Sequence, residues 1–100
     1  SADFYSPSNN REMLIRLQNN IKLRQIEAEE YKAAAKTVEI MQKIDPQEYR
    51  FSLDSGILSA RLGHYQKAIS DLEYYIGKEP NGMRKQEALT SLQQIKTNGQ

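Results

Sequence analysis

The chain has 100 residues, of which 38% are hydrophobic and 27% are charged, enough for one small domain with a modest core. Fourteen Lys and Arg residues against thirteen Asp and Glu residues give a net charge of +1, which argues against nucleic-acid binding because that function usually shows a strong basic bias. No cysteine is present, which excludes disulfides, thiolate catalysis and cysteine-ligated metals. The sequence also contains no signal peptide and no apolar run of membrane-spanning length.

Residues 1–9 show no helical pattern, and we expect them to form a linker or a lead-in from a missing N-terminal domain. Phe4 and Tyr5 are candidates to dock on the folded body. Ser8 or Asn9 is a candidate cap for the first helix, because a short polar side chain satisfies a free backbone N–H there. We expect residues 10–100 to be the helical domain, excised from a longer protein.

The first two helices are predicted over residues 10–28 and 30–44. In the first, apolar residues and one arginine recur at spacings of three or four on a single stripe: Leu14, Leu17, Ile21 and Arg24. The inward stripe of the second comprises Tyr31, Ala34, Ala35, Val38 and Met41. Pro46 disfavours helical geometry at Asp45, so the second helix should end there and Pro46 should begin the third.

The third helix is predicted over residues 47–62, with Leu58 and Leu62 on its buried face. Gly56 lies in the middle of this helix, where glycine costs about 1 kcal/mol relative to alanine. Such an unfavourable residue suggests that two backbones approach closely at Gly56. Gly63 should provide a left-handed exit from the helix.

The last two helices are predicted over residues 65–78 and 83–97, separated by Pro80 and an Asn81-Gly82 turn. The inward residues of the fourth are expected to be Tyr65, Ala68, Ile69, Leu72, Tyr75 and Ile76. Tyr74, adjacent to Tyr75, must then point outward. The last helix carries Ala88, Leu89, Leu92 and Ile95 on one side, and its other face is polar, as a terminal cap requires.

The second and fourth helices repeat each other at a spacing of 34 residues. The matched pairs are Tyr31 and Tyr65, Ala34 and Ala68, Val38 and Leu72, Met41 and Tyr75, and Pro46 and Pro80. A period of about 34 residues is typical of helix–turn–helix repeat arrays. The sequence therefore predicts an all-α array of antiparallel helix hairpins with about five helices, namely two repeats and a capping helix.

These residues resemble the tetratricopeptide repeat. The places that its pattern gives to glycine, tyrosine, alanine, a small or aromatic residue and proline are filled by Gly56, Gly63, Tyr65, Ala68, Tyr75 and Pro80 in the second copy, and by Tyr31, Ala34 and Pro46 in the first. The first copy departs from the pattern at Lys22 and Glu29, where glycines are usual.

A narrower resemblance covers most of the chain, which is similar to the C-terminal repeat region of the bacterial SirB family. It rests on Asn20-Ile21-Lys22, on Asp54 and Gly56, and on the repeat motifs; Ser55 stands where that family usually has an arginine. The resemblance implies that a transglutaminase-like domain of papain-type ancestry precedes these repeats, so no active-site residue falls in this chain. We expect the protein to be cytoplasmic.

The favoured function is a non-catalytic binding module. The leading helix of each pair lines the concave face in paired-helix repeats, which predicts a short groove with an apolar centre and a basic rim. Its residues would be Arg16, Asn19, Leu23, Arg50, Leu53, Ile57, Arg61, Arg84 and Glu87. Such a surface suits an extended peptide, a helix or the adjoining domain of the same protein, whereas nucleic acid and membrane are not expected partners. The alternative is that these leucines only fill gaps between the helices and that the arginines only solvate the protein surface.

Other functions are less favoured by the sequence. Tetratricopeptide domains that bind acidic chaperone C-termini need asparagines and lysines at set places; Asn19 and Asn20 are available, but Asp54 would repel a carboxylate. His64 is the only histidine and has no cysteine or serine–acid partner, so we expect no enzyme. The acidic groups Glu27, Glu29, Glu30 and Asp71, Glu73 look like solvated helix ends, and no metal or cofactor is expected. A structural or dimerisation domain without a peptide groove stays open, because two repeats bury little area.

Overall fold

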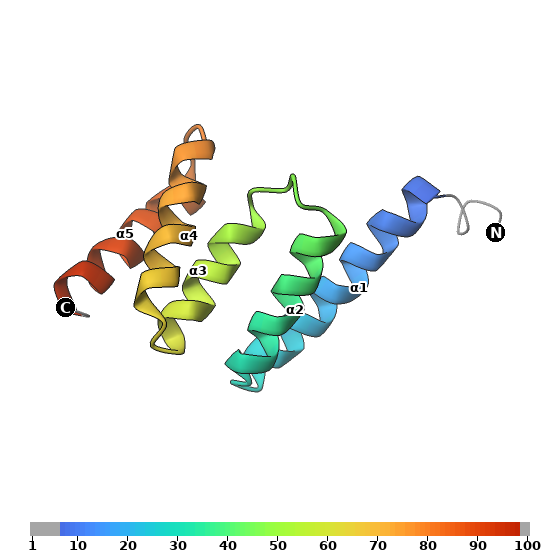
Figure 1. Cartoon of the computed structure of the whole chain (residues 1–100), viewed down its shortest axis with the longest axis horizontal. Helices are drawn as coiled ribbons and strands as arrows, with labels where there is room; N and C mark the ends of the chain where they lie inside the picture. Colours follow the sequence, from blue (N-terminus) through green and yellow to red (C-terminus); the bar gives the residue numbers. More distant parts are fainter. Residues whose placement is uncertain (1–6, 99–100) are drawn as a thin grey trace. The chain divides into compact units, whose positions relative to one another are not determined.

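Figure 1 shows a computed structural model of the chain, which describes residues 7–98 and, within them, contains five α-helices and no strand. The all-α class predicted from the sequence is therefore confirmed. Phe4 and Tyr5 lie outside the described residues. The helices are α1 (Pro7–Glu27), α2 (Tyr31–Ile44), α3 (Phe51–Arg61), α4 (Tyr65–Lys78) and α5 (Met83–Asn98).

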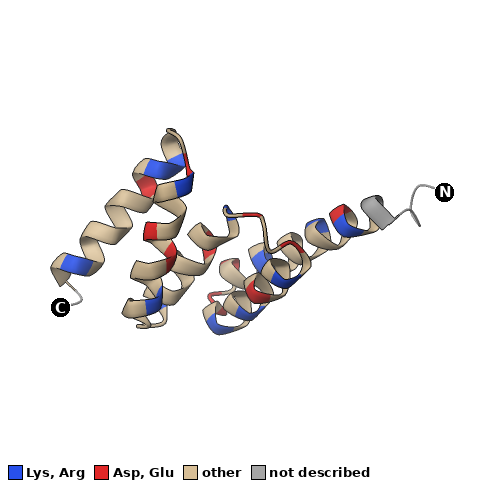
Figure 2. Cartoon of the chain, turned by 45° about the horizontal axis from the view of Figure 1, so that its top comes forward, with Lys and Arg blue, Asp and Glu red and all other residues tan. Residues whose placement is uncertain are grey.

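The chain divides into two compact units, residues 1–48 and residues 49–100. The first unit contains the hairpin of α1 and α2, and the second contains α3, α4 and α5. In the second unit α4 packs against both α3 and α5 (Figure 1). Figure 2 shows basic and acidic residues interspersed along the helices of each unit.

Residues matched by the 34-residue repeat are buried to a similar degree in the two units. Three of the matched pairs are core residues with at most 2% of their surface exposed: Ala34 and Ala68, Val38 and Leu72, and Met41 and Tyr75. Each proline of the fifth pair follows the C-cap of its helix, Asp45 before Pro46 and Glu79 before Pro80. The two hairpins are therefore built on the same pattern of inward positions.

Side-chain hydrogen bonds join α1 to α2 in the first unit. The buried Thr37 hydroxyl donates to Oε1 of Gln25 at 2.7 Å. Nε of Arg11 donates to the backbone carbonyl of Ile44 at 3.2 Å, which satisfies a carbonyl left free at the end of α2. These contacts fix the register of the antiparallel pair.

Residues 7–27 are helical, as the spacing of Leu14, Leu17 and Ile21 predicted. These three residues do not, however, mark the packed face of α1. These three side chains are 42–51% exposed. Lys22, which stands where the repeat pattern usually has a glycine, is instead buried, with 6% of its surface exposed. The long aliphatic stem of a lysine can cover apolar surface, which the spacing of leucines and isoleucines does not reveal.

The loops that close the two hairpins have the same backbone hydrogen bonds. Glu29 N–H donates to Ile26 and Glu30 N–H donates to Gln25, at 2.9 and 2.8 Å. In the second hairpin, Gly63 N–H donates to Ala60 and His64 N–H to Ser59, at 3.1 and 2.8 Å. Both are Schellman motifs, which need a left-handed residue after the helix. Gly63 supplies it with φ of 81°, as predicted, whereas Glu29 occupies the equivalent place with φ of 60°.

The core of the second unit surrounds α4. It contains Leu53, Ala68, Leu72, Tyr75, Ala88 and Ile95. Gly56 lies against α4 as predicted, because a methyl group added there would lie 2.8 Å from Cγ of Leu72 and 3.3 Å from the carbonyl oxygen of Ala68. Beside this contact the buried Ser55 hydroxyl donates to Oδ2 of Asp71 at 2.6 Å, and Nζ of Lys67 lies 3.2 Å from the same oxygen.

Tyr49 and Tyr75 pack together in the second unit, with ring centroids 5.8 Å apart. The Tyr49 hydroxyl donates to Oε1 of Glu79 at 2.8 Å. This hydrogen bond to a carboxylate raises the pKa of Tyr49 above its usual value. Burial, together with the negative charge of Glu79, raises the pKa of Tyr75 in the same direction.

Several predicted boundaries were wrong. Helix α1 begins at Pro7, so Ser8 and Asn9 lie inside it and do not occupy its N-cap. Helix α3 begins at Phe51 and not at residue 47, because residues 46–47 and 49–50 form turns, with Glu48 N–H bonded to the Asp45 carbonyl. Pro46 therefore ends one helix without beginning the next.

Two inward assignments were also wrong, while the outward position of Tyr74 is confirmed. Tyr65 is 40% exposed and Leu89 is 38% exposed, although both share a helix with core residues. Each lies at the margin of its inward stripe. Tyr74 is 50% exposed, whereas its neighbour Tyr75 is 2% exposed.

Candidate functional site

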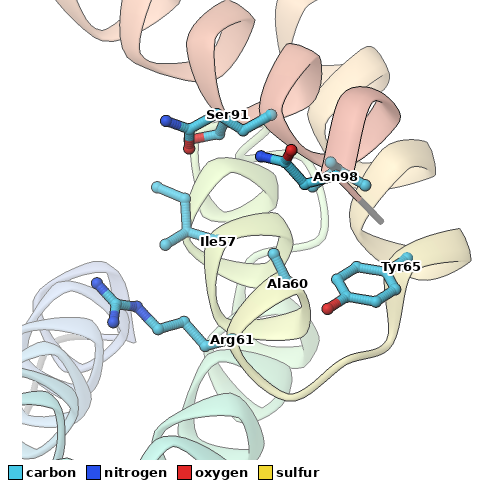
Figure 3. Close-up of a pocket in the computed structure, with 8 residues that line it drawn as sticks. Ile57, Ala60, Arg61, Tyr65, Ser91 and Asn98 are labelled. Atoms are coloured by element: carbon cyan, nitrogen blue, oxygen red, sulfur yellow. The ribbon is translucent and has the colours of Figure 1, made fainter. Parts of the chain in front are cut away.

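A pocket of about 370 Å³ lies in the second unit, between α3 and α5. Figure 3 shows residues of α3 and α5 around it, with Tyr65, the first residue of α4, at one end. The lining residues are Ile57, Ala60, Arg61, Tyr65, Ser91, Gln94, Ile95 and Asn98. The pocket therefore lies where the C-terminal halves of the two outer helices flank α4.

The sequence divides this lining into an apolar part and a polar part. Ile57 and Ala60 are half-buried and pack on the core, and Ile95 is itself a core residue. On α5, Ser91, Gln94 and Asn98 recur every three or four residues, so they lie on one side of the helix. Apolar contact area is thus combined with hydroxyl and amide groups that can donate and accept hydrogen bonds.

Two of the residues predicted for the concave face, Ile57 and Arg61, line this pocket. Arg50, Arg84 and Glu87 lie on the same helices or beside them, but the pocket does not include them. Arg84 and Glu87 are exposed, and Nε of Arg84 lies 3.3 Å from Oε1 of Glu87. A surface ion pair of this kind contributes less than about 1 kcal/mol.

Leu53 corrects the predicted groove. Only 1% of its surface is exposed, and it belongs to the core around α4. A side chain buried to this degree offers no surface to a partner. Leu53 lies one helical turn before Ile57 on α3, but it packs in the core around α4. The repeat alignment did not distinguish the buried Leu53 from the pocket-lining Ile57.

The other predicted residues belong to the first unit. Arg16 and Leu23 are exposed on α1, with Leu23 at 48%, and Asn19 is half-buried. These three lie on a side of α1 that the exposed stripe of Leu14, Leu17 and Ile21 does not occupy, as their spacing along the helix requires.

A model of the tetratricopeptide repeat family matches residues 21–94, about three quarters of the chain. The chain belongs to the tetratricopeptide repeat family. Repeats of this family generally mediate protein–protein interaction and are generally not catalytic. Comparisons with curated proteins and with solved structures found no match.

Four residues that line the pocket were not predicted as site residues from the sequence. Tyr65 fills the tyrosine place of the tetratricopeptide pattern and was expected to point inward, yet it is partly exposed and lines the pocket. Ser91, Gln94 and Asn98 belong to the polar side of the capping helix, where a solvated surface was the simplest interpretation. Their spacing of three or four residues on α5 could have predicted that they share one side of that helix, the side that meets Ile57 and Arg61 of α3 at the pocket.

His64 and the acidic groups considered in the sequence are not among the residues that line the pocket. His64 is exposed at the N-cap of α4 and its side chain makes no capping hydrogen bond. Within residues 7–98 no three His, Asp or Glu side chains are grouped so that they could hold a metal ion. None of the helices in this described range combines the length and the apolar character needed to cross a membrane.

Proposed function

We propose that this tetratricopeptide chain is a protein–protein interaction module that takes an apolar side chain of a partner peptide into the pocket between α3 and α5. The observation that carries the proposal is the composition of the pocket. Ile57, Ala60 and Ile95 offer apolar contact, while Gln94 and Asn98 offer amides. A peptide backbone has both donors and acceptors, so amide side chains suit it whatever its sequence.

The size and charge of the pocket narrow the partner. A volume of about 370 Å³ is at the lower end of ligand pockets, which run from about 300 to 1,000 Å³, so it suits one or two side chains of a peptide. Arg61 lines the pocket and would favour a carboxylate beside the apolar side chain. We therefore expect an extended or helical segment that combines an apolar anchor with an acidic neighbour.

The other predicted residues stay part of this proposal as two separate surfaces. In the second unit, Arg50, Arg84 and Glu87 would contact the partner outside the pocket. In the first unit, Arg16, Asn19 and Leu23 would provide a further contact, supported by the exposure of Arg16 and Leu23. These contacts would add orientation more than affinity, because exposed charges contribute little.

The similarity to the SirB family supports a more specific proposal, in which the partner is an adjoining transglutaminase-like domain of the same protein and the location is cytoplasmic. Asn20-Ile21-Lys22, Asp54 and Gly56 carry this similarity. The alternative function, a structural or dimerisation domain with no peptide groove, is favoured by the small size of a two-repeat array.

Selection from a phage-displayed peptide library tests the proposal without knowledge of the partner. Peptides enriched on this chain would be synthesised and titrated against the wild type and Tyr65→Ala. Because Tyr65 lines the pocket, its removal should weaken binding by about tenfold or more. Tyr74→Ala is a matched control, since Tyr74 is an exposed tyrosine on the same helix that does not line the pocket, and it should leave the affinity unchanged.

Either of two results would contradict the proposal. Selection that yields no binding peptide would remove the peptide site. Peptides that bind Tyr65→Ala as tightly as the wild type would place the contact elsewhere on the chain. A circular dichroism spectrum of each variant would show that the helices are retained.

A further inference from the structure

A second depression, of about 230 Å³, lies on α5 beside the pocket between α3 and α5. Its lining comes from α5 alone, from five residues that recur every three or four positions and that we call the α5 hollow: Thr90, Gln93, Gln94, Thr97 and Asn98. Gln94 and Asn98 line the pocket as well. The pocket and the α5 hollow are therefore neighbours, and these two amide side chains form the border between them.

The turn of the helix gives the position of the α5 hollow relative to the pocket. Ala88 and Ile95 belong to the core around α4, and Thr90, Gln93 and Thr97 fall on the opposite side of α5. The residues that α5 gives to the pocket lie between these two sides. Their centre is about a quarter of a turn from that of the α5 hollow, which is about 8–9 Å along a helix surface of about 5–6 Å radius.

The α5 hollow offers hydroxyl and amide groups and is lined by no charged residue. The charged side chains nearest to it along α5 have partners elsewhere, because Nζ of Lys96 lies 3.4 Å from Oε2 of Glu73 and Nε of Arg84 lies 3.3 Å from Oε1 of Glu87. A charged side chain of a partner would lose hydration here without meeting an opposite charge. An apolar one would leave the amides and hydroxyls without hydrogen bonds, so the α5 hollow suits an uncharged polar side chain.

The two border residues favour an extended peptide over a helical one. The side-chain amide of Gln94 or Asn98 can donate to a backbone carbonyl and accept from a backbone N–H. An extended peptide has these groups free, whereas a helix bonds them internally. Side chains on one side of an extended chain recur every second residue, at about 6.6–6.8 Å, so the second residue from one in the pocket reaches the α5 hollow.

We propose that the α5 hollow contacts the partner peptide two residues from its apolar anchor and selects serine, threonine, asparagine or glutamine there. This inference rests on the proposed function, because the anchor in the pocket brings the peptide to the α5 hollow. Gln94 and Asn98 bind the peptide backbone between the two side chains. Arg61 belongs to α3, on the other side of the pocket (Figure 3), so the acidic neighbour and the uncharged polar residue lie on opposite sides of the anchor.

Peptides selected on the wild-type chain test this inference by titration. An alanine scan of each peptide identifies the anchor as the apolar residue whose loss weakens binding to the wild type but not to Tyr65→Ala. Lysine is then placed two residues from the anchor, on the side away from the acidic neighbour. The substitution should weaken binding to the wild type about threefold to tenfold, because a hydrogen bond is lost and a charge is partly desolvated.

A charge introduced into the α5 hollow should reverse this preference. Gln93→Glu should bind the lysine peptide about twofold to fivefold more tightly than the wild type does. Gln86→Glu is a matched control, since Gln86 is an exposed glutamine of the same helix that lines neither depression. It lies about 10 Å before Gln93, beyond the screening length of about 8 Å at physiological salt, and should leave the affinity unchanged.

The outcomes separate this inference from the proposal for the pocket. Peptides that depend on Tyr65 but accept lysine two residues from the anchor without loss would overturn the inference and leave the pocket proposal standing. Equal effects of Gln93→Glu and Gln86→Glu on the lysine peptide would do the same. Peptide binding that does not depend on Tyr65 would remove the pocket proposal, and the role of the α5 hollow with it.

Discussion

Gly56 of α3 lies against Leu72 of α4 so closely that a β-carbon at position 56 would come within 2.8 Å of Cγ and 2.9 Å of Cδ2 of Leu72. Leu72 is fully buried, and the carbonyl oxygen of Ala68 lies 3.3 Å from the same point. The Leu72 side chain has no exposed surface into which it could move, and the Ala68 oxygen belongs to the backbone. Any larger residue at position 56 would therefore force the two helices apart or displace Leu72.

Gly56→Ala should destabilise the chain even though alanine is the better helix former. The helix preference of alanine offers about 1 kcal/mol, whereas overpacking a core contact costs about 1–3 kcal/mol. We expect a net loss in the free energy of unfolding, measured by urea denaturation. Gly77→Ala is the control, because nothing lies within 4 Å of its added methyl group, and it should stabilise the chain by about 0.5–1 kcal/mol. A Gly56→Ala variant more stable than the wild type would contradict the close contact.

Glu29→Gly should stabilise the first hairpin. Glu29 has φ of 60°, a left-handed conformation that costs a residue with a side chain about 1–2 kcal/mol and costs glycine almost nothing. Allowing for the greater freedom of glycine in the unfolded chain, we expect a gain of about 1 kcal/mol. Thermal unfolding followed by circular dichroism measures it.

The converse change at the equivalent place serves as the control for the Glu29 prediction. Gly63→Ala, at φ of 81°, should destabilise the chain by about 1–2 kcal/mol, although nothing crowds the added methyl group. If both variants moved the melting temperature in the same direction, backbone conformation would not be the cause.

Ala68→Leu should overpack the second unit, since Ala68 has no exposed surface and its backbone lies against Gly56. We expect a loss of about 1–3 kcal/mol in the free energy of unfolding. Ser70→Leu adds a similar volume to an exposed position of the same helix and should change stability by less than about 0.5 kcal/mol. An unchanged midpoint for Ala68→Leu would contradict its inward position.

Alkaline pH should destabilise the second unit. Tyr49 and Tyr75 both have a raised pKa, because the hydrogen bond to Glu79 holds Tyr49 neutral and burial disfavours ionisation of Tyr75. A group whose folded pKa exceeds its unfolded value contributes stability that is complete below the unfolded pKa, here 10.0, and is lost as the pH rises through the folded pKa. The free energy of unfolding should therefore fall above about pH 10.

Urea denaturation between about pH 7 and about pH 11 measures this effect. Tyr49→Phe should reduce the alkaline loss, because one of the two ionising groups is removed. Tyr74→Phe, which changes an exposed tyrosine, should retain the full loss. A pH dependence that Tyr49→Phe leaves unaltered would assign the effect to other groups.

Helical periodicity predicted the fold but not every packed face. The span of α4 was predicted to the residue, and Ala34, Val38, Ala68 and Leu72 were correctly placed inward, because the repeat and the apolar spacing agree there. Helix α1 is different: its apolar stripe is exposed, and a lysine occupies its packed side. Spacing alone gives a stripe and not its direction, which depends on the neighbouring helix.

The candidate site was predicted only in part for a similar reason. Ile57 and Arg61 were found because the repeat pattern assigns them to the leading helix. Leu53 was wrongly included because it lies on the same helix, and Tyr65 was missed because its place in the pattern is usually inward. Whether a residue lines a pocket depends on the position of a second helix, here α5. The periodicity of a single helix does not give that position.

The unequal glycine content of the two hairpins has a consequence for anyone who extends this array by design. The second hairpin has Gly56 at its helix crossing and Gly63 in its loop, while the first places Lys22 and Glu29 there, one buried and the other left-handed. A lengthened array copied from residues 49–82 would therefore inherit relaxed loops and close crossings. One copied from the first hairpin would accumulate a strained turn and a buried amine with every added unit.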